Sequence, residues 1–235
     1  HNVGAMLLYT QREYRNSVLP NRLQGFSGRA TYDYGQRYLF EFNFGYNGSE
    51  RMAKGNRFEF FPAVSLGWVI SNEEFFKPFS RVVDNLKIRG SYGLVGSDET
   101  GSNLTDVPHF LYIDNISLTG GGGFTTGMSG ANLNMNGPIV NQYAVQNAGW
   151  ERAKKLDLGV DLTLFRNWNI TFDYFRENRY NILLHREAWP ESLGYYTAKP
   201  WSNLGKVRNS GIEFSTTYRQ AITKDFSMEV RGNFT

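Results

Sequence analysis

The chain has 235 residues, of which 40% are hydrophobic and 16% aromatic, and its formal net charge is +3. It has no cysteine, which excludes disulfide frameworks and thiolate metal sites. Its basic residues are dispersed among acids, so no basic stripe predicts a nucleic-acid partner. The longest apolar runs are far shorter than the roughly 18 residues of a membrane-spanning helix. The 14 Tyr, 18 Phe and 25 Gly favour an all-β protein.

The clearest pattern in the chain is a hairpin over residues 26–47. One face of its two strands is aromatic or small, because Phe or Tyr occupies every second position from Tyr38 to Tyr46. The other face carries Arg29, Asp33 and Glu41. This period of two predicts antiparallel strands, and their length of about nine or ten residues suffices to cross a bilayer. A soluble sheet with the apolar face inward and a membrane barrel with the apolar face toward lipid both fit the hairpin alone.

The whole chain is predicted to consist of strands joined by connections of unequal length. We expect strands over residues 1–10, 26–34, 38–47, 58–70, 86–95, 151–165, around 170–174, 207–219 and 226–234. The connections 11–25, 48–56, 96–149 and 183–204 alternate with short turns at 35–36, 166–168 and 221–225. The segment 71–85, which allows a short helical turn, is the one exception because it is of intermediate length. Successive strands run up and down, so the long loops leave one rim and the short turns leave the other. This asymmetry is typical of bacterial outer-membrane barrels.

Four stretches carry a family resemblance. They are YDYGQRYLFEFNFGYNGSERMAKGNRFEFFPAVSLGWVISNEEFF, LKIRGSYGLVGSDE, WERAKKLDLGVDLTLF and NLGKVRNSGIEFS. In this order they resemble the barrel of the SusC/RagA-type TonB-linked outer-membrane transporters (TonB-dependent receptors) of Bacteroidetes. The resemblance implies a transmembrane antiparallel β-barrel of 22 strands, with long extracellular loops and short periplasmic turns. Residues 1–235 are expected to supply about nine of those strands, without the plug domain or the TonB box that the family carries.

The resemblance also implies a function. A SusC-like protein is a transporter rather than an enzyme, needs no cofactor, and takes up oligosaccharides or oligopeptides through the outer membrane. Its expected partners are a SusD-like surface lipoprotein over the extracellular mouth, the TonB complex acting through the plug, the glycan or peptide substrate, and outer-membrane lipid. A soluble secreted β-sheet carbohydrate-binding module is the alternative, and it would require the aromatic stripes to meet in a closed core.

Two groups of residues are candidates for function. Charged residues on the polar strand faces are expected to face the lumen, where they line a substrate path or contact the plug, or merely form a hydrated wall: Lys87, Arg89, Asp157, Asp161, Glu213, Glu229 and Arg231. Aromatic residues in the expected extracellular loops are candidates for substrate binding by stacking on sugar rings, or for packing of loop against loop: Tyr112, Trp189, Tyr195, Tyr196 and Trp201.

No pattern in the sequence predicts catalysis or a bound metal. The three histidines are far apart and lack the spacing of metal ligands. The run from Gly120 to Gly123 is not followed by the Lys-Ser/Thr of a phosphate-binding loop. Adjacent acids such as Glu73 and Glu74 indicate a solvated loop more readily than acid–base chemistry.

Overall fold

The computed structural model describes residues 1–15, 20–98, 110–128, 131–186, 192 and 200–235. Among these residues, nine strands form one antiparallel sheet in which every strand pairs with the next one along the sheet. The strands are β1 (Asn2–Tyr14), β2 (Asn21–Tyr34), β3 (Tyr38–Ser49), β4 (Phe58–Val69), β5 (Val83–Ser97), β8 (Glu151–Leu164), β9 (Trp168–His185), β10 (Trp201–Ala221) and β11 (Ser227–Phe234). The sheet is open, because β1 and β11 each have one neighbour. The all-β class and the number of sheet strands are as predicted.

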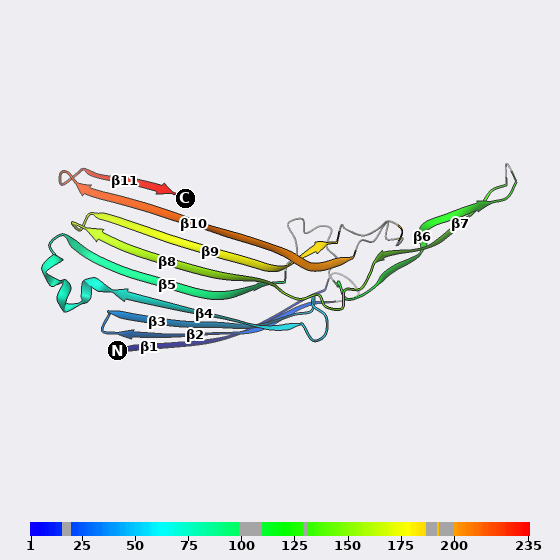
Figure 1. The fold of residues 1–235 in the computed structure, drawn as a ribbon, viewed down its shortest axis with the longest axis horizontal. Coiled ribbons are helices and arrows are strands. Elements are labelled where there is room, and N and C mark those ends of the chain that lie inside the picture. Colours follow the sequence, from blue (N-terminus) through cyan, green and yellow to red (C-terminus); the bar gives the residue numbers. More distant parts are fainter. Residues whose placement is uncertain (16–19, 99–109, 129–130, 187–191, 193–199) are drawn as a thin grey trace.

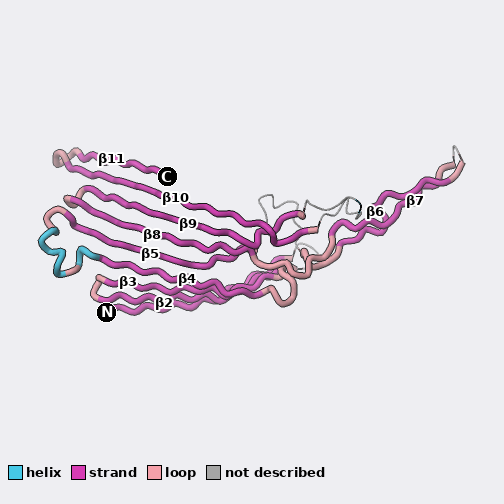
Figure 2. The backbone as a smooth tube through the Cα atoms, viewed as in Figure 1, coloured by secondary structure: helices cyan, strands magenta, loops and turns pink. Residues whose placement is uncertain are grey.

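The two ends of the sheet differ in the way the sequence predicts. Figure 1 shows the turns β2–β3, β8–β9 and β10–β11 at one end, together with the β4–β5 connection. The strand ends that flank the connections β1–β2, β3–β4, β5–β8 and β9–β10 lie at the other end. We call these ends the short-turn rim and the long-loop rim. The β4–β5 connection contains the 3₁₀ helices η1 (Ile70–Asn72) and η2 (Glu74–Phe79), the cyan segment of Figure 2, so a helical turn was correctly predicted there. Neither helix is long and apolar enough to cross a membrane.

The long segment 96–149 was predicted as a loop, and this was wrong in part. It contains a second sheet of two strands, β6 (Asn115–Thr126) and β7 (Leu133–Gln142), which projects beyond the long-loop rim (Figure 1). The ladder between them has register shifts on both sides of Gly121. These shifts break the period of two, and the glycines supply no side chains to mark a face, so no alternation indicates a strand here.

Two other predicted loops were too long. The expected loop 11–25 begins only after Tyr14, because the β1–β2 ladder continues until Tyr14 pairs with Asn21. In the same way β9 extends to His185, which pairs with Trp201 at the start of β10, within the expected loop 183–204. Residues 11–13 are polar on both faces and residues 182–184 are apolar on both faces, so the hydrophobic alternation is lost at both strand ends although the backbone ladder persists.

The sheet has one apolar face and one polar face. Direct pairing keeps residues on the same face, and the series Tyr34–Tyr38–Trp68 continues the aromatic face across three strands. This face is exposed, with Leu66 60% and Tyr92 51% accessible. Among the described residues the buried apolar clusters lie instead near the long-loop rim, for example Met52 with Phe61 and Trp150. The aromatic face therefore lacks the closed core that a soluble binding module would need, and its character suits contact with lipid.

Candidate functional site

The polar face of the sheet centres on Arg89 in β5. Its guanidinium contacts three carboxylates on two neighbouring strands, with Nη1 3.0 Å from Asp157, Nε 3.3 Å from Asp161 and Nη2 2.5 Å from Asp173. The register places Arg89 directly opposite Gly159, between Asp157 and Asp161 along β8. The absence of a side chain at Gly159 leaves room for the guanidinium. One cation thus holds β5, β8 and β9 together on the polar face.

All seven residues that were predicted to face the lumen lie on this same face. Lys87 pairs directly with Asp161, and Glu213 in β10 pairs with Asp173. Glu229 and Arg231 of β11 lie opposite Arg219 and Thr217, further along the same face. The structure brings Arg89, Asp157 and Asp161 into contact, whereas Glu229 and Arg231 belong to a separate cluster with Arg219.

Sequence reasoning missed Asp173 as a site residue. Asp173 lies on β9, and only 17% of its side chain is exposed, the lowest fraction among the three carboxylates around Arg89. The signal was present, because Asp173 alternates with Phe172 and Tyr174, as the acids of β8 alternate with leucines. That pattern does not indicate which strand lies next to Arg89, because the neighbour depends on the pairing of β5 with β8 and of β8 with β9.

A hollow of about 600 Å³ lies along the polar face beside the Arg89 cluster. Its lining includes Asp33, Glu41, Lys87, Arg89 and Asp157. Glu41 also forms an ion pair of 2.6 Å with Arg29 on β2. The wall thus presents charges of both signs, most of them already paired across strands. Apolar residues such as Leu39 also contribute to the lining, so the hollow is not purely polar.

Of the five predicted loop aromatics, Tyr112 and Trp201 are described, and Trp189, Tyr195 and Tyr196 lie outside the described residues. The Tyr112 hydroxyl donates to the Glu50 carbonyl at 3.1 Å and receives a hydrogen bond from Arg57 at 3.4 Å. The Arg57 guanidinium also lies over the Tyr112 ring, 5.9 Å from its centroid. Tyr112 therefore ties the β5–β8 connection to the β3–β4 loop.

Trp201 is not a loop residue, contrary to the prediction, but the first residue of β10. Its ring lies against His185, with 3.6 Å between centroids, and packs on the buried cluster that includes Leu111 and Leu183. Both described aromatics thus pack within the long-loop rim, and their role in substrate binding stays a prediction. Within the described residues no group of three or more His, Cys, Asp or Glu is arranged to hold a metal ion.

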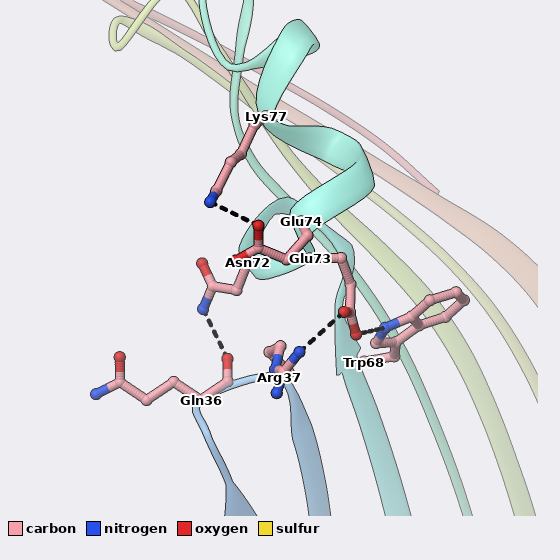
Figure 3. A network of polar contacts seen from close by, with 7 residues as sticks. All are labelled: Gln36, Arg37, Trp68, Asn72, Glu73, Glu74 and Lys77. Carbon is pink, nitrogen blue, oxygen red and sulfur yellow. Dashed lines mark hydrogen bonds and ion pairs between the residues drawn. The ribbon is translucent and has the colours of Figure 1, made fainter.

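A second polar network lies at the short-turn rim (Figure 3). The buried carboxylate of Glu73 accepts hydrogen bonds from Arg37 Nη1 at 3.2 Å and from Trp68 Nε1 at 3.1 Å. Nearby, Asn72 donates to the Gln36 carbonyl at 2.7 Å. Hydrogen bonds from the Tyr38 hydroxyl, then from Trp68 and Arg37, hold the pKa of Glu73 below its usual value. The network fastens the β4–β5 connection to the β2–β3 turn.

Comparison with known proteins agrees with this architecture. Residues 7–235 match the family described as TonB dependent receptor-like, beta-barrel. The chain is 31% identical over 235 residues to the TonB-dependent receptor SusC of Bacteroides thetaiotaomicron, covering 95% of this chain and 21% of SusC. It is 30% identical over 208 residues to the TonB-dependent receptor P3 of Formosa agariphila, covering 88% of this chain and 19% of P3. The chain thus spans about a fifth of the length of these curated relatives.

Solved structures share the fold. The RagAB peptide importer in its closed-closed state superposes with a TM-score of 0.71 at 17% identity, over 92% of this chain and 22% of that chain. The siderophore receptor PirA from Pseudomonas aeruginosa superposes with a TM-score of 0.54 at 11% identity, over 99% of this chain and 38% of that chain. The sheet with one lipid-type face and one charged face, and the family match over nearly the whole chain, lead to one conclusion: the chain belongs to the TonB-dependent receptor-like β-barrel family of the bacterial outer membrane.

Proposed function

We propose that this chain forms part of the barrel wall of a transporter that imports oligosaccharides or oligopeptides across the outer membrane. The observation that carries the proposal is the division of the sheet into an exposed aromatic face and a face of paired charges. In a wide membrane barrel the first face meets lipid and the second lines the water-filled interior. The protein would therefore bind and move its substrate and would not transform it.

The polar face supports passage of a polar substrate along the wall. Arg89 is shared by three carboxylates and Arg29 pairs with Glu41, so each of these two cations is matched by acids and a small negative excess remains on the wall. A neutral glycan or a zwitterionic peptide carries no net charge, so it meets no large electrostatic barrier on such a wall. The same surface is available to a plug domain, which would sit inside the barrel and connect it to the TonB complex.

The projecting hairpin β6–β7 supports a protein partner at the long-loop rim. Residues 115–142 contain no charged residue, whereas 20% of the whole chain is charged. Apolar side chains on this hairpin are exposed, including Leu118 at 77% and Phe124 at 63%. An uncharged, apolar surface on a projecting arm is typical of a protein interface and not of a site for anionic lipid headgroups. We assign the partner as the SusD-like surface lipoprotein that caps the transporter.

Uptake measurements test the proposed function. A strain that lacks the protein containing this chain is compared with the complemented strain, using labelled oligosaccharides and labelled oligopeptides in parallel. We expect one of the two substrate classes to lose uptake in the deletion strain, and a protonophore to abolish the same uptake in the complemented strain. Unchanged uptake of both classes, or recovery of the protein in a fraction other than the outer membrane, would contradict the proposal.

A further inference from the structure

The aromatic face marks where the membrane interface crosses the strands. In β3, Tyr38 and Tyr46 lie at the two ends of a row whose interior consists of Phe40, Phe42 and Phe44. The two tyrosines are eight residues apart, about 26 Å along the strand, which is on the scale of the apolar band of outer-membrane barrels. Tyr and Trp prefer the boundary between acyl chains and headgroups, so Tyr38 indicates the interface at the short-turn rim.

Neighbouring strands continue this aromatic boundary. Trp68 pairs directly with Tyr38, and their rings stack with 6.4 Å between centroids and 10° between planes. Farther along the sheet, Trp168 of β9 pairs with Tyr218 of β10 at the same rim. We call Tyr38, Trp68, Trp168 and Tyr218 the short-rim girdle.

The β4–β5 connection folds back onto this girdle. The Glu73 carboxylate accepts hydrogen bonds from the indole of Trp68 and from the hydroxyl of Tyr38. It therefore lies at the level of two girdle residues. Arg37 supplies the opposite charge at 3.2 Å (Figure 3). The following residues therefore start beside the membrane boundary, on the aromatic side of the sheet, and not at a point far beyond the rim.

The helix that follows is amphipathic. A 3₁₀ helix has three residues per turn, so side chains three positions apart share a side. Glu74 and Lys77 form an ion pair of 2.7 Å on one side, and the rings of Phe76 and Phe79 lie 5.7 Å apart on another. Phe75 and Phe79 are 62% and 61% exposed within the chain. Two of the three sides of η2 are thus apolar and largely uncovered.

We propose that residues 70–82 form an interfacial lipid anchor, in which Phe75 and Phe79 insert between the lipid headgroups of the leaflet at the short-turn rim. Continuity with the short-rim girdle selects lipid as the occupant, because the girdle residues that hold Glu73 are themselves on the lipid-facing side. The ion pair Glu74–Lys77 faces the headgroup layer, and the Glu73 network fixes the depth of the anchor. The inference needs the barrel to lie in the membrane and does not depend on the substrate class.

Spin-label depth measurements test the anchor. The full-length protein, freed of any native cysteine, is reconstituted in phosphatidylethanolamine/phosphatidylglycerol vesicles with a nitroxide at Phe79→Cys, at Phe75→Cys or at one of two controls. Glu74→Cys tests the polar side of the same helix, and Thr223→Cys tests the β10–β11 turn at the same rim. Correct assembly of each variant is verified by the heat-dependent gel mobility of the folded barrel, so a misfolded variant is recognised before its label is interpreted.

We expect the labels at 75 and 79 to collide with oxygen several times more often than with a water-soluble nickel complex, and the Glu74→Cys label to show the reverse preference. If the labels at 75 and 79 are as accessible to nickel as the label at 223, the anchor does not exist. If they are shielded from both oxygen and nickel, they pack against protein, which also overturns the proposal. Glu73→Gln should raise nickel accessibility at position 79, because the clamp to Arg37 is lost. None of these readouts involves transport.

Discussion

Gly159 lies directly opposite Arg89 in the ladder between β5 and β8, and the Arg89 guanidinium occupies the space that a side chain at position 159 would fill. A Cβ atom at this position would come within 2.6 Å of Arg89 Cζ. The missing side chain lets one arginine reach Asp157 and Asp161 on either side of Gly159, and Asp173 on the strand beyond. A glycine and an arginine on adjacent strands thus form a unit that organises the polar wall.

Replacing Gly159 by alanine should displace the Arg89 guanidinium and weaken its contacts with the three aspartates. We expect a loss of about 1 kcal/mol in the stability of the barrel, no more than removal of the arginine itself would cost, because the atoms that must move belong to the ends of the Arg89 and Asp173 side chains. The measurement is the temperature at which the full-length barrel loses its heat-dependent gel mobility. Gly67→Ala is the matched control, because Gly67 is the other direct neighbour of Arg89 and a Cβ there meets nothing closer than 3.4 Å. Equal stability of the two variants would contradict the spatial role of Gly159.

Arg89→Gln should leave three aspartates close together without their shared cation. We expect a cost of about 1–2 kcal/mol, less than for a fully buried ion pair because a third of the Arg89 side chain is exposed. Adding Asp173→Asn to Arg89→Gln should recover part of the loss by reducing the repulsion, and denaturant unfolding of the four proteins in a double-mutant cycle measures this coupling. Strictly additive effects would show that Asp173 and Arg89 are not coupled.

The short-turn rim should lose stability in acid. The pKa of Glu73 is lowered from its ordinary value of 4.5, so its hydrogen bonds stabilise the folded rim fully above about pH 4.5 and lose their effect as the pH falls through the lower pKa of the folded state. The protection of the amides in residues 70–82 of the reconstituted protein, meaning the ratio of the intrinsic to the observed exchange rate at each pH, should therefore fall below about pH 4.5.

The variant Glu73→Gln separates this effect from general acid unfolding. Its amides in residues 70–82 should be less protected from exchange at neutral pH, and their protection should change less on acidification. The nearby pair Glu74–Lys77 also weakens in acid, since Lys77 lowers the pKa of Glu74, so Glu74→Gln serves as the second reference. If Glu73→Gln and the unmodified protein respond identically to acid, Glu73 does not control the rim.

Removing the rings of Trp189 and Trp201 together should weaken substrate capture, if the aromatics of the long-loop rim stack on substrate. Because Trp201 also packs on His185 and Leu183, the single variant Trp201→Ala should in addition lower the stability of that rim by about 3 kcal/mol at most. Affinity for the transported class, measured on the purified full-length protein, distinguishes capture from packing. Unchanged affinity and uptake in the double variant would remove the stacking hypothesis.

Residues 1–235 should not form a stable soluble protein when they are produced alone. Both β1 and β11 have an unpaired edge, and the aromatic face of the sheet has no protein layer over it among the described residues. We expect aggregation without detergent, observed as elution in the void volume on size-exclusion chromatography. A monodisperse, folded preparation in plain buffer would contradict this expectation and would restore the soluble β-sheet module as an interpretation.

The sequence by itself determined the strands and their two faces wherever large apolar residues alternate with polar ones. The row from Tyr38 to Tyr46 could be read directly, because a period of two places these rings on one face whatever the neighbours are. The seven charged residues were assigned to the other face for the same reason. The alternation of long and short connections gave the two rims, since antiparallel strands must exit at opposite ends in turn.

Only the tertiary structure decided which charges meet. Arg89 contacts Asp173 because β5 pairs with β8, across the β6–β7 excursion, and no local pattern specifies that pairing or its register. The strands β6 and β7 were missed because glycine and register shifts erase the period of two, while the backbone ladder needs no side-chain pattern. Glu73 was read as a solvated acid, yet the fold buries it against Trp68, since the β4–β5 connection turns back onto the sheet. Alternation along a strand is a local property of the chain, whereas contacts between strands depend on long-range pairing.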